Sequence, residues 1–277
     1  MSEAAQSTAT LAEGASARIL DAGDGTILKV YRGDLGTLLQ KREFHYATLA
    51  HAGGLPTPKP LERLDVDGAP ALRFEHFEGT GLDSWTLPRF WNWRRASRTL
   101  AELHARMHVL AAEESYDILH PTQDQLYRFL ISECAALDDA TRAACLAPLE
   151  DPSRRRRLCH GDFSPANVMT DGRTHTIVDW SLASTGDPIL DVAFTWVGIR
   201  ELPERLDLSP TLRRVLRYGS EIYLQTYLAM AERAPTREQI VELLPTAAAA
   251  RLGALERADG PAAERAALVG LIGEALA

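Results

Sequence analysis

Leu158-Cys-His-Gly-Asp-Phe-Ser-Pro-Ala-Asn-Val-Met169, followed by Thr176-Ile-Val-Asp-Trp180 and by Gly186-Asp-Pro-Ile-Leu-Asp191, is the stretch that decides the fold. Its apolar runs at 168–169 and 176–178 flank a turn signal at 171–173, Asp-Gly-Arg. Two short apolar runs around such a turn predict a small β-hairpin.

Three polar side chains stand at the ends of this predicted hairpin. Asn167 directly precedes the first run, Asp179 directly follows the second, and Asp162 lies on the tight loop that leads in. Two oxygen-bearing side chains held close together suit a hard cation such as Mg²⁺. A further carboxylate can orient an attacking hydroxyl, so the three residues together provide what phosphoryl transfer requires.

The alternative interpretation is that these are ordinary turn residues, because Asp and Asn are favoured in turns by local hydrogen bonds. For any one of them that interpretation would be preferred. The combined spacing, followed by Gly-Asp-Pro-x-x-Asp at 186–191, favours the functional interpretation.

The order His160-Gly161-Asp162, Asn167, Asp179 resembles the catalytic signature of aminoglycoside phosphotransferases and related small-molecule kinases, such as choline, homoserine, fructosamine and methylthioribose kinases. The resemblance implies that Asp162 is the catalytic base and that Asn167 and Asp179 bind Mg²⁺.

The same resemblance implies supporting roles for two further residues. Asp191 would brace the catalytic loop through hydrogen bonds, and His160 would be structural. The match to protein kinases is weaker. Ser164 stands where those enzymes usually carry Lys, Trp180-Ser181 replaces Phe-Gly, and the sequence has no Ala-Pro-Glu segment.

The resemblance implies an α+β, protein-kinase-like bilobal fold. A small N-terminal lobe, with an antiparallel β-sheet and one helix, is expected to bind the nucleotide over residues 1–78. A larger, mainly helical lobe over residues 79–277 is expected to hold the catalytic and acceptor-binding residues. Residues 1–10 are expected to be disordered.

The N-terminal segment carries candidates for phosphate binding. Strands are predicted at 17–20 and 26–31, around a turn, and a helix at 37–52. By resemblance, Lys29 in the second strand would hold the nucleotide phosphates and Glu43 in the helix would pair with Lys29. The alternatives are a solvent-facing lysine at a sheet edge and one more charge on a solvated helix face.

Two backbone sites complete the expected nucleotide site. Gly14 and Ser16 belong to a loop of small residues whose amides can approach a phosphate. Two more strands are predicted at 61–65 and 71–75, and after them Glu75 to Phe77 resemble the family's hinge, where backbone groups would meet the adenine.

A long helix is predicted over 87–110 from its apolar periodicity. Trp91 and Trp93 near its start line a pocket or belong to the core. His104 and His108 have a spacing that suits a metal, but no carboxylate completes the pattern, so His104 is interpreted as a packed helix residue.

The segment 111–152 is the most acidic, and a basic run follows at 154–157. Solvated helix faces explain the acidic residues; a position near a polyamine acceptor is the alternative. The basic run is expected to face that segment or solvent. Helices are predicted over 211–234 and from 238 to the C-terminus, and by resemblance they help to shape the acceptor site. The candidate acceptor-binding residues are Glu201, Asp207, Glu221 and Tyr227.

Composition excludes several classes of function. The 277 residues are 45% hydrophobic and 25% charged, and the net charge of −8 argues against nucleic acid as a partner. No apolar run approaches a membrane span and the N-terminus does not resemble a signal peptide. Three cysteines without metal spacing indicate reduced, partly buried thiols in a cytoplasmic protein. The protein is expected to be a monomer or a homodimer.

The sequence therefore predicts a Mg²⁺-dependent phosphotransferase that uses ATP or GTP and a small-molecule hydroxyl acceptor, with an aminoglycoside or another amine-bearing compound as one possibility. A metabolic kinase of choline, homoserine or sugar type is the first alternative. A non-catalytic, pseudokinase-like nucleotide-binding module is the second.

Overall fold

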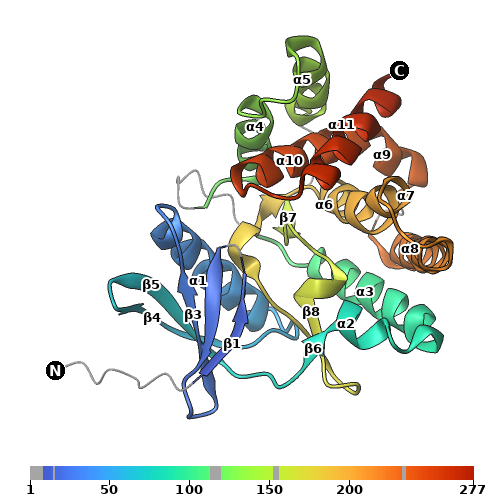
Figure 1. Ribbon diagram of the computed structural model, residues 1–277. Helices are drawn as coiled ribbons and strands as arrows, with labels where there is room; N and C mark the ends of the chain where they lie inside the picture. Colours follow the sequence, from blue (N-terminus) through green and yellow to red (C-terminus); the bar gives the residue numbers. More distant parts are fainter. Residues whose placement is uncertain (1–8, 15, 113–119, 152–155, 233–234) are drawn as a thin grey trace.

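The computed structural model describes residues 9–14, 16–112, 120–151, 156–232 and 235–277. An antiparallel sheet with one helix forms the N-terminal part, and a mainly helical part follows (Figure 1). The predicted α+β architecture is confirmed. The expected boundary at residue 78 falls in the connection between two strands, which end and begin at Glu75 and Thr80.

Five strands form the N-terminal sheet in the order β1-β2-β3-β5-β4, and all neighbouring pairs are antiparallel. The predicted strands in this region are present. The bounds are β1 Ala9–Glu13, β2 Ala17–Asp21, β3 Thr26–Tyr31, β4 Pro60–Val66 and β5 Ala69–Glu75.

The prediction of a disordered lead over residues 1–10 is wrong for Ala9 and Thr10, which pair with Asp21 and Leu20 of β2. All five residues of β1 are exposed at the sheet edge. An exposed edge strand lacks the apolar alternation that identifies a half-buried strand, so no periodic pattern predicted it. Residues 1–8 lie outside the described residues.

Helix α1 (Gly36–Ala52) packs against β3, β4 and β5 and matches the helix predicted at 37–52. Its buried side includes Tyr46, Ala47 and Ala50, which join the hydrophobic core. Glu43 lies on that buried side too. A carboxylate is rarely buried without a partner, so this position already indicates an ion pair.

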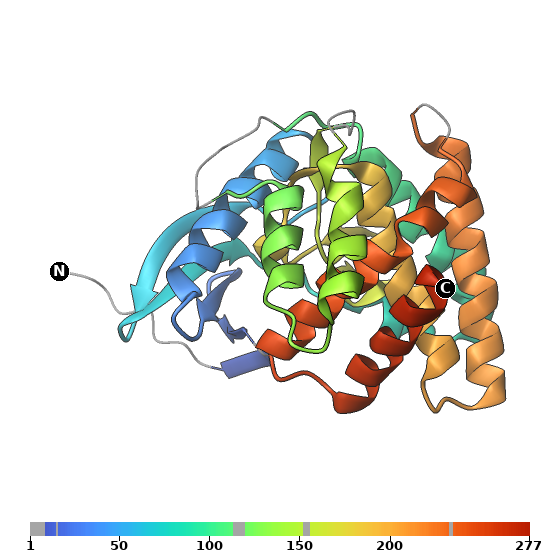
Figure 2. The same cartoon turned by 90° about the horizontal axis from the view of Figure 1, so that it is seen from above.

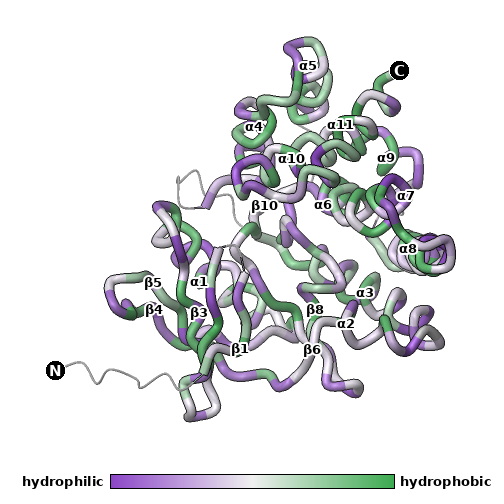
Figure 3. Tube along the Cα trace, viewed as in Figure 1, coloured by the Kyte–Doolittle hydropathy of each residue, from purple (hydrophilic) through white to green (hydrophobic). Residues whose placement is uncertain are grey.

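Helices make up most of the C-terminal part. Their bounds are α2 Leu82–Thr86, α3 Trp93–Met107, α4 Gln123–Ser132, α5 Asp139–Leu146, α6 Pro188–Trp196, α7 Leu202–Arg205, α8 Pro210–Met230, α9 Arg237–Glu242, α10 Leu244–Arg257 and α11 Ala262–Leu276. Helix α10 packs against α4, α5 and α11; in the view from above the red helices lie beside the green ones (Figure 2). Helix α8 carries both hydrophobic and hydrophilic residues (Figure 3), and its Tyr223 and Tyr227 are buried where it meets α3.

Two helix predictions are wrong in extent. The single helix expected over 87–110 is α3 alone, preceded by a 3₁₀ turn at Phe90–Asn92. The single helix expected from residue 238 onward is α9, α10 and α11. Pro245 stands in the first turn of α10, and Pro261 precedes α11. Proline lacks the amide that would continue a helix, which is why the breaks fall there.

The predicted hairpin is confirmed and belongs to a small three-stranded sheet. Its strands are β8 (Val168–Thr170) and β9 (His175–Ile177), with β6 (Thr80–Gly81) beside β8. Strand β7 (Arg157–Cys159) pairs with β10 (Ser184–Gly186). The amide of Ile177 donates to Pro56 O at 2.7 Å, and Thr57 Oγ1 donates to Ile177 O at 2.9 Å. These bonds connect the hairpin to the segment between α1 and β4.

A π-helical turn, Val197–Glu201, connects α6 to α7. A π turn closes i→i+5 hydrogen bonds and is wider than an α turn. Gly198 and Ile199 of this turn line a cavity beside the loop that follows β7.

The described helices include none with the length and apolarity needed to cross a membrane. Cys134, Cys145 and Cys159 are free and buried, as the sequence indicated.

We expect Gly253→Ala to lower the free energy of unfolding by about 2 kcal/mol or more, because a Cβ there would collide with the backbone carbonyl of Leu130 where α10 meets α4. Gly270→Ala is the matched control. A Cβ on Gly270 of α11 meets open space, so the higher helix propensity of Ala should leave stability equal or raise it by up to about 1 kcal/mol. Denaturant unfolding measures both; equal effects of the two substitutions would contradict the close packing of α10 on α4.

Candidate active site

The loop from His160 to Asn167, called the 160–167 loop below, joins β7 to β8. Gly161 has a φ of 80°, and a Cβ on it would collide with the backbone of Leu182, so this position requires glycine. Asn167 Nδ2 donates to Asp162 O at 2.8 Å and to Asp162 Oδ2 at 3.2 Å. These two bonds fix the carboxylate of Asp162, whose side chain is 41% exposed.

Asp179 follows β9 in the left-handed conformation, with a φ of 65°. Aspartate tolerates this conformation better than most residues. Its Oδ1 accepts from Ser181 Oγ at 2.6 Å and from Lys29 Nζ at 2.9 Å. The residue therefore reaches the N-terminal sheet from the end of the hairpin.

Lys29, Glu43 and Asp179 form a buried charge cluster. Lys29 Nζ lies 2.7 Å from Glu43 Oε2, and the Tyr31 hydroxyl donates to the same oxygen at 2.5 Å. Burial alone would lower the pKa of Lys29, but the carboxylates of Asp179 and Glu43 raise it above its usual value. Burial alone would raise the pKa of Asp179, and the Lys29 ammonium holds it well below the usual range. Burial raises the pKa of Glu43 above its usual value, although the Lys29 ammonium opposes the shift. The shifts of Lys29 and Asp179 keep these two groups charged at neutral pH.

Asn167 and Asp179 fit a hard cation. Asn167 Nδ2 is directed at Asp162, which leaves its Oδ1 as an acceptor. Asp179 Oδ1 receives Lys29 and Ser181, while Oδ2 has no donor among the described residues. Amide and carboxylate oxygens are the ligands that Mg²⁺ prefers, so these two residues are candidates to hold the ion.

Desolvation raises the pKa of Asp162 above its usual value, although Arg251 opposes the shift. Arg251 Nη1 lies 3.7 Å from Asp162 Oδ1. The two carboxylate oxygens thus face different surroundings: Oδ2 faces Asn167 and Oδ1 faces Arg251. A carboxylate of raised pKa, fixed and partly open to solvent, can accept a proton from a bound hydroxyl.

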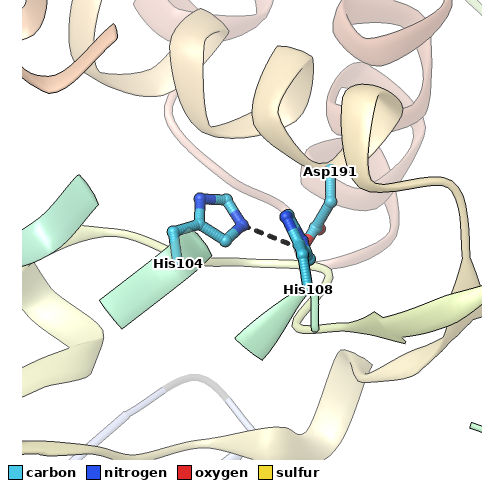
Figure 4. Close-up of side chains that lie close together, drawn as sticks. All are labelled: His104, His108 and Asp191. Atoms are coloured by element: carbon cyan, nitrogen blue, oxygen red, sulfur yellow. Dashed lines mark hydrogen bonds and ion pairs between the residues drawn. The ribbon is translucent and has the colours of Figure 1, made fainter. Parts of the chain in front are cut away.

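Asp191 of α6 is fully buried and accepts four hydrogen bonds. The amides of His160 and Gly161 donate to it at 2.9 and 3.0 Å. His104 Nε2 and His108 Nε2, both directed at Asp191 in Figure 4, lie 3.1 and 3.3 Å from Oδ2. Burial alone would raise the pKa of Asp191, but the bonds from His104 and His108 lower it far below the usual range.

Each histidine has a second partner on α8. Tyr223 OH lies 2.7 Å from His104 Nδ1, and Tyr227 OH lies 2.7 Å from His108 Nδ1. Burial and the neighbouring His108 lower the pKa of His104 to about 3. His104 is therefore neutral, which lets Nε2–H donate to Asp191 and Nδ1 accept from tyrosine.

Asp191 is thus the carboxylate that the His104 and His108 pattern lacked in the sequence. Ligand atoms of these three residues lie within 4.8 Å of one another. Hydrogen bonds already use the ring nitrogens, so the structure supports the interpretation of His104 as a packed helix residue. The predicted role of Asp191 in bracing the 160–167 loop has a direct geometric basis.

The expected phosphate loop and hinge supply fewer open backbone groups than anticipated. The Gly14 amide donates to Ala17 O at 2.8 Å, and the Ser16 carbonyl accepts from Arg32. In the hinge the amides of Glu75 and His76 also have partners. Among the described residues, the Phe77 amide has no hydrogen-bond acceptor.

The four acceptor candidates chosen from sequence are not among the described residues that line the cavity beside the 160–167 loop. Tyr227 bonds His108, Glu201 pairs with Arg205 at 2.9 Å, Glu221 pairs with Arg237, and Asp207 is exposed on a loop. Trp93 does line the cavity, whereas Trp91 is 67% exposed.

Two residues beside the site were missed from sequence: Arg251 and Tyr223. Both lie on C-terminal helices whose lateral packing no local pattern reports. Arg156 of the basic run pairs with Asp124 of the acidic segment at 2.6 Å. For this residue the structure agrees with the first of the two predicted positions, which faces the acidic segment. Residues 113–119 and 154–155 of these two segments lie outside the described residues.

Comparison with known proteins agrees with this geometry. A family model described as a phosphotransferase enzyme family matches residues 8–232. The structure is similar to a thermostable mutant of the aminoglycoside phosphotransferase APH(4)-Ia in its apo form, with a TM-score of 0.66 and 20% identity over 97% of this chain and 93% of that one. The same mutant background has been solved as a ternary complex with AMP-PNP and hygromycin B, with a TM-score of 0.66 and 19% identity over 97% and 92% of the chains.

A choline/ethanolamine kinase family protein from Mesorhizobium loti gives a TM-score of 0.59 at 16% identity, over 97% of this chain and 86% of that one. At such identities the matches show the fold alone, and they confirm the predicted kinase-like architecture. Acyl-CoA dehydrogenase family member 11 of Gallus gallus is 24% identical over an alignment of 186 residues that covers 55% of this chain. The match spans only 22% of that relative's length.

We expect the neutral state of His104 to make stability depend on pH. The unfolded side chain takes up a proton below about pH 6.5, whereas the folded one does so only near 3, so the unfolded state binds more protons between these values. The free energy of unfolding of the wild type should therefore fall on acidification from about pH 6.5 to about pH 5. In His104→Gln the free energy of unfolding should fall less steeply, with a slope smaller by up to ~1.4 kcal/mol per pH unit.

The control is Leu87→Gln, at an exposed position that carries no ionisable group, whose slope should equal that of the wild type. Denaturant titrations at several pH values give the slopes. Parallel curves for His104→Gln and the wild type would show that His104 is not neutral in the folded protein.

Proposed function

Because the chain belongs to the phosphotransferase enzyme family, we propose that it transfers the γ-phosphoryl group of ATP or GTP to a hydroxyl group of a small molecule. One observation carries the proposal: Lys29, Glu43 and Asp179 form a connected charge cluster, and Asn167 links the metal-ligand side to Asp162. Phosphoryl transfer needs a clamp on the phosphates, a metal position and a group that orients the nucleophile.

The nucleotide side of the proposed site uses the N-terminal sheet. Lys29, held by Glu43, would bind the phosphates, and the backbone of Phe77 would meet the base. The ternary complex of APH(4)-Ia contains AMP-PNP and hygromycin B, a nucleotide analogue and an antibiotic, which supports a site for both a nucleotide and a small molecule here.

Asn167 Oδ1 and Asp179 Oδ2 would hold Mg²⁺, which neutralises phosphate charge when bound. The protein's own contribution is to hold these oxygens in place through Ser181, Lys29 and the Asp162 contact. Lys29 already places positive charge at Asp179, so the side chain is ionised and ready to bind a cation.

Asp162 would accept the proton of the acceptor hydroxyl. Its bonds from Asn167 keep the carboxylate in one orientation, and its raised pKa makes it a stronger base than an ordinary aspartate. Positioning and charge neutralisation would then supply most of the rate acceleration.

We expect Asp162→Asn to reduce kcat by about 10²–10⁴-fold, because the variant keeps the size of the side chain but cannot accept the proton. Nucleotide affinity should remain nearly unchanged. The assay is acceptor-dependent release of nucleoside diphosphate from Mg-ATP and Mg-GTP across aminoglycosides, choline, homoserine and hydroxy acids. Asp67→Asn, at an exposed turn with positive φ that Asn tolerates, is the control and should keep full activity.

Full turnover by Asp162→Asn would refute its assignment as base. A non-catalytic nucleotide-binding module would release no diphosphate with any acceptor in either form, although Mg-nucleotide would still bind.

We expect Asp179→Ala to weaken Mg-nucleotide binding by about tenfold or more, because it removes a proposed metal ligand and a partner of Lys29. Calorimetric titration with and without Mg²⁺ provides the check. Chelating Mg²⁺ should weaken binding to the wild type but change binding to Asp179→Ala little. An equal response of both proteins to chelation would show that Asp179 does not hold the ion.

A further inference from the structure

We propose that the acceptor is a hydroxylated organic acid whose apolar body fills the cavity beside the 160–167 loop and whose anionic group binds Arg251. This inference rests on the proposed phosphotransferase function and names its acceptor class. It differs from the amine-bearing acceptor that the acidic segment suggested.

The cavity has a volume of about 230 Å³ and extends from the 160–167 loop between α2, α3, α8 and the π turn at 197–201. Its wall includes Phe163 to Ala166, directly after Asp162. Large apolar side chains dominate the wall: Leu82, Trp93, Leu100, Phe163, Ile199 and Leu216. Such a wall stabilises an apolar ligand and offers few hydrogen bonds to a many-hydroxylated one.

Only two charged residues line this cavity among those described, Asp83 and Arg251. Asp83 lies in the first turn of α2, where the positive end of the helix dipole favours a carboxylate, and its Oδ1 is close to Gly81. Asp83 is thus favoured by the start of its own helix, and Arg251 is the one cation that lines the cavity among the described residues.

The Arg251 guanidinium is held by packing contacts, but few of its hydrogen-bond donors have an acceptor. Its guanidinium lies 5.2 Å from the centroid of the Phe194 ring and against Gly198, and its side chain is 22% exposed. The nearest carboxylate oxygen, Asp162 Oδ1, is 3.7 Å away, beyond hydrogen-bond distance. Nε is buried and no described residue accepts a hydrogen bond from the guanidinium. A guanidinium has five donors in a planar fork, which match a carboxylate or phosphate.

Arg251 and the metal ligands lie on different sides of Asp162. Oδ2 of Asp162 faces Asn167, and Oδ1 faces Arg251. The nucleotide phosphates belong to the Asn167 side, so an anion on Arg251 belongs to the acceptor. Since Asp162 and Arg251 are only 3.7 Å apart, the accepting hydroxyl and the anionic group must be a few bonds apart in that molecule.

Among the described residues, Asp83 is the one carboxylate that lines this cavity. Glu204, on the neighbouring α7, pairs with Arg217 and, at 3.3 Å, with Arg200. Among the residues that line the cavity, the charge nearest to Asp162 is the positive charge of Arg251, which would repel an amine placed beside it.

Calorimetry with three sets of compounds tests the proposal independently of turnover. The probes are α-, β- and γ-hydroxy alkanoic acids, their methyl esters, and amino alcohols of the same chain length. We expect the wild type to bind at least one acid about tenfold or more tightly than its ester and than the amino alcohol, because a charged hydrogen bond to Arg251 is lost in both.

The variants identify the residue responsible. Arg251→Met should abolish the preference for acid over ester while ester binding persists, and Arg251→Lys should retain part of it because the charge remains. The matched control is Arg257→Met, since Arg257 lies on the same helix over another ring, that of Phe129, and does not line the cavity. Arg257→Met should show the same preference for acid over ester as the wild type.

Three outcomes would overturn the proposal: no binding of any acid, tighter binding of the amino alcohols, or an acid preference that survives in Arg251→Met. Weaker Mg-ATP binding in Arg251→Met with unchanged acid binding would assign the arginine to the nucleotide instead. That result would also overturn the proposal. Phosphate transfer is assayed separately. Transfer only to amino alcohols would keep the phosphotransferase function and reject this acceptor class, whereas acid binding without transfer to any acceptor would reject the function and keep the site.

Discussion

The buried carboxylate of Asp191 is the constraint on which the rest of the site depends. It accepts from two consecutive amides of the 160–167 loop and from two histidines of the α3 segment. Tyr223 and Tyr227 extend this network to α8. A buried anion with four donors fixes backbone as well as side chains. The position of Asp162, one residue beyond these amides, is therefore set by the packing of three helices.

A second constraint crosses from the N-terminal sheet to the hairpin. Lys29 joins Glu43 of α1 to Asp179 of the hairpin, and Thr57 bonds Ile177 close by. The Lys29 ion pairs are charged and the Thr57 hydrogen bond is neutral, yet both connect the N-terminal part of the chain to the hairpin. A nucleotide bound between them would contact residues whose relative position these bonds already define, which reduces the ordering needed on binding.

Interactions between residues close together in the sequence could be predicted, and interactions between distant segments could not. The hairpin with Asn167 and Asp179 depends on residues a few positions apart, and the motif identified it. Lys29 with Glu43 required the family resemblance, because nothing local indicates that a strand and a helix share an ion pair. The association of His104 and His108 with Asp191, and of Arg251 with Asp162, depends on lateral helix packing and left no trace in periodicity. The exposed strand β1 escaped notice because an edge strand buries no face.

The π turn at Val197–Glu201 has a consequence for changes in chain length. Its i→i+5 bonds accommodate one residue more than an α-helical turn would. A further residue inserted after this turn would rotate everything that follows by about 100°, turning Arg205 away from Glu274 of α11. Families that retain this cavity should therefore accept substitutions within the turn far more readily than insertions after it, so the length of the segment carries information that its residue identities do not.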